Sequence, residues 1–250
     1  EQNQVVRENE KRSLVSLNNE LADRKKIAED NKKKNLQLLV QTKNKESDYT
    51  KILNQKIAQK QAFEKELRDY ESTLKYILDP TSIPSRGTRV FAHPLDKILV
   101  TQQFGKTSSS GRLYASGTHN GTDFAASIGT PVKAVLDGIV IGTGDTDMQK
   151  GCYSYGKWVL VKHPNGLSTL YAHFSLVKVT KGQLVSTGEL LGYSGSTGYS
   201  TGPHLHLTVF ASDAVEVVKL GSYKKQKTGC SDVEMPVAAT NAYLDPMDYF

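Results

Sequence analysis

Apolar side chains in the first third of the chain recur at helical spacing. Separations of four, three, four and three positions give a short heptad seam, formed by Phe63, Leu67, Tyr70, Leu74 and Ile77. Residues 1–79 also contain no glycine and no proline, the two residues that most disfavour helix interiors. The pattern therefore predicts long helix over this whole segment.

The partner of this helical segment stays open. A second seam begins with three leucines, Leu14, Leu17 and Leu21. Its continuation would place polar residues in a coiled-coil core, namely Arg24, Asn31 and Asn35, so the early half is a poor coiled coil. Three arrangements remain: a parallel dimer, an antiparallel hairpin with a turn near Asn44–Tyr49, or one helix packed on the rest of the chain.

The helical pattern ends at Asp79-Pro80, because proline cannot continue a helix and restricts the residue before it. The next stretch, residues 80–92, carries Pro, Ser and Gly and is typical of a linker. We therefore expect a helical coiled-coil region over residues 1–79, a linker over 80–92, and a second domain over 93–250 with a C-terminal extension from about residue 211.

From about Phe91 the pattern changes to short runs of β-branched and aromatic residues separated by Gly, Asn, Ser or Asp. Runs such as KWVLVKH, LSTLYAHF and HLHLTVF are typical of strands between frequent turns. All 20 glycines and 8 prolines fall after residue 79. About 155 residues are enough to bury a substantial core. We therefore predict an all-β domain after the helical region.

Charge and composition narrow the classes of partner. The formal net charge of +6 fits either a solvated, lysine-rich surface or attraction to an anionic polymer. The sequence has no helix-turn-helix, no RNP-type aromatic strand and no zinc-finger spacing, so we expect no nucleic-acid partner. No window approaches the roughly 18–20 apolar residues of a membrane span. The sequence starts at Glu1 without an apolar leader, so we expect any signal or membrane anchor to lie outside it.

Two short segments carry side chains that suit a metal ion. In GTHNGTDFA, His119 and Asp123 lie four residues apart, so an extended strand points both to the same side, with Gly121 leaving the space between them open. In GPHLHLTVF, His204 and His206 are two residues apart and again share a face. Three N/O ligands with an open fourth position are typical of catalytic zinc.

Spacing alone leaves two questions open at these segments. It does not decide between His204 and His206 as the third ligand, and it does not show that the two strands are neighbours. Histidines that bind no metal, on the surface or in the core, are therefore the alternative at this point.

The surroundings of these segments are more specific. HNGTDFAASIGTPVKAVLDGIV, YGKWVLVKHPNGLSTLYAHF and KGQLVSTGELLGYSGSTGYSTGPHLHL together resemble the lysostaphin-type, or LytM-type, peptidoglycan endopeptidases. That family carries an H-x3-D motif, a central Y-x-H segment and an H-x-H motif in this order. The resemblance runs from about Pro94 to Phe210.

Carried over position by position, the resemblance implies that His119, Asp123 and His206 bind one Zn²⁺ per chain. It also implies that His173 and His204 are active-site histidines that do not bind the metal. A neutral histidine near a zinc-bound water can take its proton or donate to the developing oxyanion. The resemblance does not decide which of the two does which.

Four further features of this domain carry weaker expectations. Tyr171 shares a strand face with His173 by simple alternation and would then line the cleft. His163 precedes a Pro-Asn-Gly turn and is interpreted as structural, and His93 is interpreted as a surface residue. The loop with Gly195, Gly198 and Gly202 either lines the substrate cleft or only connects two strands.

A second likeness concerns architecture alone. GTPVKAVLDGIVIGTG and KGQLVSTGELLG also resemble the hairpin sandwich of biotinyl- and lipoyl-carrier domains. Those carriers need an attachment lysine at a hairpin tip, and no such motif lies between the two halves here. We therefore expect an antiparallel sheet related to that sandwich, without the carrier function.

The two cysteines, Cys152 and Cys230, allow one intramolecular pairing. Because an exported wall enzyme works in an oxidising space, the resemblance favours a disulfide over two buried free thiols. Such a bridge would contribute about 4 kcal/mol on the chain-entropy account.

The resemblance implies a zinc-dependent endopeptidase that hydrolyses peptide bonds in peptidoglycan stem or cross-bridge peptides, outside the cytoplasm. The alternative is a coiled-coil scaffold or activator of another cell-wall hydrolase, with little activity of its own. Members of that kind generally lack a metal ligand, and none is missing here. Residues 1–79 would then supply self-association or a protein partner.

Overall fold

The structure is a computed structural model that describes residues 2–42, 46–107, 117–222 and 228–250. It divides into two compact units, residues 1–52 and residues 53–250. The division falls inside the second helix, and each unit is described here by itself. Among the described residues, no helix combines the length and the apolar character that crossing a membrane requires.

The first unit consists mainly of helix α1 (Gln2–Thr42), followed by the beginning of α2 (Glu46–Glu71). The turn predicted near Asn44–Tyr49 falls partly on residues 43–45, which lie outside the described residues, whereas Glu46–Tyr49 are helical. The leucines of the early seam are 58–61% exposed.

The predicted helix end at Asp79 is wrong, because α2 ends at Glu71. The hydroxyl groups of Ser72 and Thr73 donate to the carbonyl groups of Asp69 and Tyr70 at 2.9 and 2.7 Å. Such side-chain bonds compete with helical backbone bonds and favour helix ends. The residues that follow then leave the helix and pack partly against the sheet, including Leu74 and Leu78.

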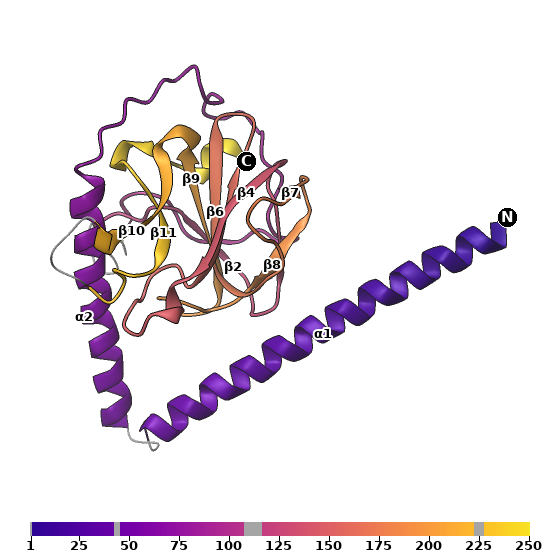
Figure 1. Cartoon of the computed structure of the whole chain (residues 1–250), viewed down its shortest axis with the longest axis horizontal. Coiled ribbons are helices and arrows are strands. Elements are labelled where there is room, and N and C mark those ends of the chain that lie inside the picture. Colours follow the sequence, from indigo (N-terminus) through magenta and orange to yellow (C-terminus); the bar gives the residue numbers. More distant parts are fainter. Residues whose placement is uncertain (1, 43–45, 108–116, 223–227) are drawn as a thin grey trace. The chain divides into compact units, whose positions relative to one another are not determined.

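The late heptad seam packs on the rest of the same unit. Phe63 and Leu67 are 3% and 9% exposed and join a cluster that contains Trp158 and Phe210 of the sheet. Ile77, the last seam position, is 92% exposed because it lies beyond the helix. Of the three predicted arrangements, a helix packed on the other domain therefore describes this half of α2 (Figure 1).

The second unit is built on a ten-stranded antiparallel sheet, which confirms the predicted fold class (Figure 1). Along its main path the strands run β1-β2-β9-β6-β5-β4-β7, while β8 pairs with β3 and β6, and β12 pairs with β9. The strands are β1 (Val100–Gln102), β2 (Thr122–Ala125), β3 (Pro131–Lys133), β4 (Gly138–Asp145), β5 (Lys157–Lys162), β6 (Leu167–Val177), β7 (Leu184–Val185), β8 (Leu190–Ser194), β9 (His204–Ala211) and β12 (Tyr243–Leu244).

Smaller elements complete this unit. A separate hairpin consists of β10 (Val215–Lys219) and β11 (Glu234–Ala238). Short 3₁₀ helices span Thr146–Met148, Ser212–Ala214, Leu220–Ser222, Thr240–Ala242 and Pro246–Tyr249. The stretch predicted as a linker is irregular, and its Phe91 is buried and bonds through its amide to the carbonyl of Tyr249 at 3.0 Å.

Alternation along the strands divides the core between the two faces of the sheet. In β5, Val159 and Val161 join one cluster while Trp158 and Leu160 join the other. The second cluster also contains the β10–β11 hairpin and the disulfide between Cys152 and Cys230. The favoured pairing of the two cysteines is therefore present, and it ties the loop before β5 to the hairpin.

Candidate metal centre

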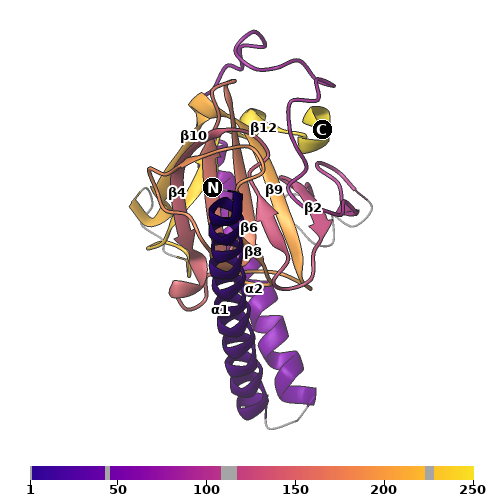
Figure 2. The same cartoon turned by 90° about the vertical axis from the view of Figure 1, so that its right-hand side faces the viewer.

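The two strands that carry the candidate ligands are direct neighbours. β2 and β9 pair antiparallel, and Asp123 lies opposite His206 in their register (Figure 2). His119 precedes β2 and forms an isolated bridge with Gly105. This pairing brings H-x3-D and H-x-H together, which spacing alone did not show.

Three side-chain atoms converge at one point between these strands. His119 Nε2 lies 3.1 Å from His206 Nδ1, and Asp123 Oδ1 lies 3.2 Å from the first of these atoms and 2.8 Å from the second. Ligands about 2.0–2.1 Å from a tetrahedral zinc ion are about 3.3 Å apart, so this donor set matches in type and spacing. The three residues are therefore able to hold a metal ion.

Gly121 keeps the space between the ligands open, as the strand pattern predicted. A Cβ atom at this position would lie 2.4 Å from the carbonyl oxygen of Leu207 and 2.8 Å from Cε1 of His206. Both distances are shorter than real Cβ contacts. Any larger residue would therefore displace the backbone of β9 or the ring of His206.

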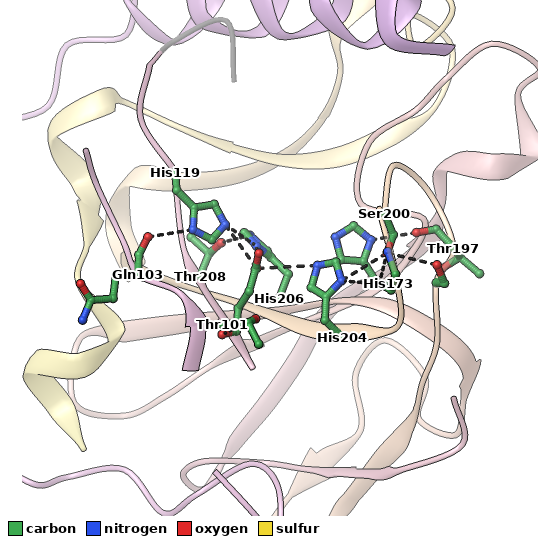
Figure 3. A network of polar contacts seen from close by, with 12 residues as sticks. Thr101, Gln103, His119, His173, Thr197, Ser200, His204, His206 and Thr208 are labelled. Carbon is green, nitrogen blue, oxygen red and sulfur yellow. Dashed lines mark hydrogen bonds and ion pairs between the residues drawn. The ribbon is translucent and has the colours of Figure 1, made fainter. Parts of the chain in front are cut away.

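Further hydrogen bonds fix which nitrogen of each ligand faces the centre (Figure 3). His119 Nδ1 donates to the carbonyl oxygen of Gln103 at 3.0 Å, which leaves Nε2 for the centre. His206 bonds through Nε2 to the hydroxyl of Thr208 at 2.9 Å, which leaves Nδ1. Partners of this kind orient metal-binding imidazoles and raise their basicity.

Burial and charge favour the ligand-competent forms. Burial alone would raise the pKa of Asp123, but hydrogen bonds from His119 and His206 and the charges of their rings hold it well below its usual range. Burial lowers the pKa of His206, against the opposing effect of Asp123. An ionised carboxylate beside a neutral imidazole is the form that binds a metal.

His173 and His204 lie beside the three candidate ligands. Their ring centroids are 4.6 Å apart, and His204 Nε2 is 3.7 Å from Asp123 Oδ1. The Nδ1 atoms donate to backbone carbonyls, that of His173 to Thr197 at 2.8 Å and that of His204 to Gly202 at 2.8 Å. Burial, with the nearby rings of His204 and His206, lowers the pKa of His173 to about 3.

The backbone at His173 explains why Tyr171 does not line the cleft, contrary to the sequence expectation. His173 has a φ of 63° and lies where two residues of β6 oppose one of β5, between the pairs Val159–Tyr171 and Lys157–Phe174. This bulge breaks the alternation of side chains. Tyr171 therefore points into the core on the other face, where its hydroxyl accepts from the amide of Val135 at 2.9 Å.

The remaining two histidines lie where the sequence placed them. His163 is buried and bonds to the carbonyl of Asp137 at 2.9 Å and to the hydroxyl of Thr169 at 2.8 Å. His93 is exposed and stacks on Phe250, with ring centroids 5.5 Å apart. Both interactions are structural.

A cleft with a volume of about 440 Å³ opens onto the candidate ligands. Tyr199, Ser200 and Thr201 line it, so the Gly-rich loop contributes to the cleft and does more than connect strands. Sequence reasoning missed two other parts of the wall. One is formed by α2, and the other by aromatic residues from separate segments, including Tyr155 before β5 and Tyr243 in β12.

Those two parts of the wall are joined by a polar chain. Asn120, next to His119, donates to the hydroxyl of Tyr155 at 2.9 Å. The hydroxyl of Tyr243 donates to the carboxyl of Glu71 at the end of α2. Burial raises the pKa of Glu71 to about 7 and that of Tyr155 beyond its usual range. No sequence motif marks these residues.

Comparison with known proteins gives a consistent result for this region. The chain is 49% identical over 94 residues to the DD-carboxypeptidase/endopeptidase Mpg of Neisseria meningitidis, covering 38% of this chain and 20% of that protein. It is 48% identical over 88 residues to the peptidoglycan DD-endopeptidase ShyA of Vibrio cholerae, covering 35% and 19%. The chain thus spans about one fifth of the length of these curated relatives.

A solved structure and a protein family also match. The catalytic domain of lysostaphin from Staphylococcus simulans is 27% identical, with 60% of this chain and 90% of that chain covered and a TM-score of 0.42. Residues 117–217 match the family described as Peptidase family M23. The resemblance stated from the sequence is confirmed, and the chain contains a domain of peptidase family M23 over these residues.

Proposed function

We propose that the chain is a zinc-dependent endopeptidase that hydrolyses peptide bonds in peptidoglycan stem or cross-bridge peptides. The observation that carries this proposal is the convergence of His119, Asp123 and His206 in a cleft that also contains two further imidazoles. The printed names of relatives, such as peptidoglycan DD-endopeptidase, support the same substrate class.

His119 Nε2, Asp123 Oδ1 and His206 Nδ1 would hold one zinc ion per chain. A donor set of two imidazoles and one carboxylate is typical of catalytic zinc, whereas structural sites usually add cysteine. Both cysteines of this chain are used in the disulfide. Zinc bound in this way supplies a Lewis acid for the scissile carbonyl and lowers the pKa of a bound water.

His173 and His204 would move the protons of the reaction. Because each Nδ1–H donates to a backbone carbonyl, each neutral ring keeps its lone pair on Nε2. A neutral ring can therefore accept a proton from the attacking water, and a protonated ring can donate to the oxyanion or to the leaving amine. The two rings are equivalent in this respect, and the proposal uses both.

The reaction would take place outside the cytoplasm, in the cell envelope or the medium. The disulfide between Cys152 and Cys230 supports this location, since such bonds persist in oxidising compartments. Peptidoglycan, the substrate class that we infer, lies in the same space.

Digestion of defined muropeptides, with products identified by mass, tests the proposal and names the bond that is cut. We expect cleavage to stop after removal of metal with a chelator and to return with zinc. Cleavage that persists in the chelated protein or in His119→Ala would contradict the mechanism. Metal analysis separates the enzyme from the scaffold alternative, which predicts well under one equivalent of zinc even when zinc is available.

A further inference from the structure

His173 has an unusual backbone conformation for a candidate catalytic residue. Its φ of 63° lies in the left-handed region, and no other non-glycine residue of the described chain has a positive φ. A residue with a Cβ atom stays in this region only when its surroundings offset the steric cost. The bulge of β6 at His173 therefore needs support from groups outside the strand.

One side-chain hydroxyl of the Gly-rich loop gives this support. Phe174, directly after His173 in β6, lies opposite Lys157 of β5. The hydroxyl of Thr197 accepts from the amide of Lys157 at 3.0 Å and donates to the carbonyl of Phe174 at 2.8 Å. A single side chain thus joins both strands beside the bulge and fixes the peptide group that follows His173.

The same residue also holds the imidazole ring of His173 (Figure 3). The carbonyl oxygen of Thr197 accepts from Nδ1 of this ring at 2.8 Å, which leaves the lone pair on Nε2. The rings of His204 and His206 lie nearby, with centroids 4.6 and 5.8 Å from that of His173. Thr197 therefore determines both the backbone conformation and the ring orientation of His173.

Thr197 is itself held by the loop before β5. Gly156 lies against it, and a Cβ atom at this glycine would collide with the carbonyl carbon and the hydroxyl oxygen of Thr197. The next residue of the Gly-rich loop, Gly198, donates its amide to the carboxylate of Asp147 at 3.0 Å. The loop before β5 and the Gly-rich loop thus form one support behind the ring of His173.

We propose that Thr197 is a positioning residue for proton transfer, because it keeps the ring of His173 in place beside the metal centre. Thr197 is 4% exposed and does not line the cleft, so it acts through His173 and not by contact with substrate. The inference rests on the proposed function, which gives His173 a role in proton transfer. A group with this role must stay within hydrogen-bond reach of the proton that it moves.

Thr197→Val tests the proposal in the full chain, since valine keeps the β-branched shape and the carbonyl but has no hydroxyl. The amide of Lys157 and the carbonyl of Phe174 then lose their side-chain partner, and the ring of His173 shifts. We expect kcat for a defined muropeptide to fall by about 10- to 100-fold, with KM and zinc content close to those of the parent. Thr197→Ser keeps the hydroxyl and should restore kcat to within about threefold of the parent value.

Thr169→Val is the matched control for loss of a buried hydroxyl. Thr169 lies in the same strand, and its hydroxyl bonds to His163 and Tyr171, away from the cleft. This variant should lower the Tm and leave kcat unchanged. Parental kcat in Thr197→Val, with only a lower Tm, overturns the proposal, because Thr197 would then be structural. Loss of zinc in Thr197→Val overturns it as well, because the residue would then act on the metal centre.

A second variant leaves the core untouched. Asp147 is exposed, and Asp147→Ala removes the acceptor of the Gly198 amide. We expect a smaller fall in kcat, about threefold, with unchanged zinc content. If Thr197→Val does not fold, Asp147→Ala decides, and parental kcat in this variant overturns the proposal.

The ring of His173 is observed directly by long-range ¹H–¹⁵N NMR, with its signals assigned by comparison with His173→Ala. We expect the Nδ1–H form in the parent and in Thr197→Ser, and altered ring signals in Thr197→Val. If the parent cleaves muropeptides but Thr197→Val leaves these signals unchanged, only the inference fails. If the parent binds zinc and shows the expected signals but cleaves no muropeptide, the proposed function fails, and the role in proton transfer fails with it.

Discussion

The two walls of the cleft are built in different ways. The strand wall places Asp123 opposite His206 through the register of β2 and β9, and both candidate histidine ligands are fixed by a further hydrogen bond. The helical wall is the last part of α2, which packs through Phe63 and Leu67 on an apolar cluster and places Lys60 over the ring of Tyr199. The groups that the proposed chemistry needs therefore lie on paired strands and their neighbouring loops, whereas the helix bounds the cleft from the other side.

Removing a ligand from the strand wall should have the largest effect. Asp123→Ala deletes one of three donors, so we expect loss of zinc and a fall in kcat/KM of about 10³-fold or more. Metal analysis and muropeptide hydrolysis measure both effects. Asp96→Ala, which removes a surface ion pair with Lys133, is the control and should change neither. Retention of zinc in Asp123→Ala would show that the metal lies elsewhere.

Removing a proton-transfer group should lower the rate without removing the metal. His204→Ala or His173→Ala is expected to reduce kcat by about 10²–10⁴-fold, the usual contribution of general acid–base catalysis. Zinc content should stay that of the parent, because neither ring belongs to the ligand cluster. Loss of zinc together with activity would instead make the histidine a ligand. Comparing kcat and metal content in one preparation separates the two roles.

The helical wall should respond to pH through Glu71. Its pKa of about 7 in the folded chain lies above the ordinary value of 4.5, so the folded state binds more protons than the unfolded one. The contribution of Glu71 to stability is therefore fully present below pH 4.5 and is lost as the pH rises through 7, by on the order of 3 kcal/mol. The thermal stability of the parent should fall between pH 5 and 8 by more than that of Glu71→Gln. Glu46→Gln, on the exposed first turn, is the control.

The smallest effect is expected at the contact between Lys60 and Tyr199. A desolvated cation–π contact contributes about 2 kcal/mol, so Lys60→Ala should lower the free energy of unfolding by up to that amount. Thermal unfolding measures this loss, and the zinc content should not change. Lys65→Ala, which truncates an exposed lysine of the same helix, serves as the comparison. Equal losses of stability in both variants would indicate a general effect of charge.

Local periodicity predicted those parts of the site that depend on one strand at a time. The shared face of His119 and Asp123 and the opening at Gly121 follow from alternation. The family resemblance, and not spacing, separated His206 from His204. The pairing of β2 with β9 joins segments more than 80 residues apart, and no local pattern encodes it.

Other features could not be predicted because tertiary contacts decide them. The bulge at His173 turns Tyr171 away from the cleft although simple alternation placed both on one face. The seam at Phe63 and Leu67 had the right period for a helix, but period does not identify the surface that a helix packs against. Glu71 and Tyr243 carry no motif, and only folding brings them together.

The position of α2 in the chain has a consequence for biosynthesis. Residues 60–71 precede every candidate catalytic residue, and His206 is the last of these to be made. Synthesis proceeds from the N-terminus, so this wall of the cleft exists before the site that it faces can assemble. The candidate metal centre can therefore form only at a late stage of synthesis, once the strand that carries His206 has been made.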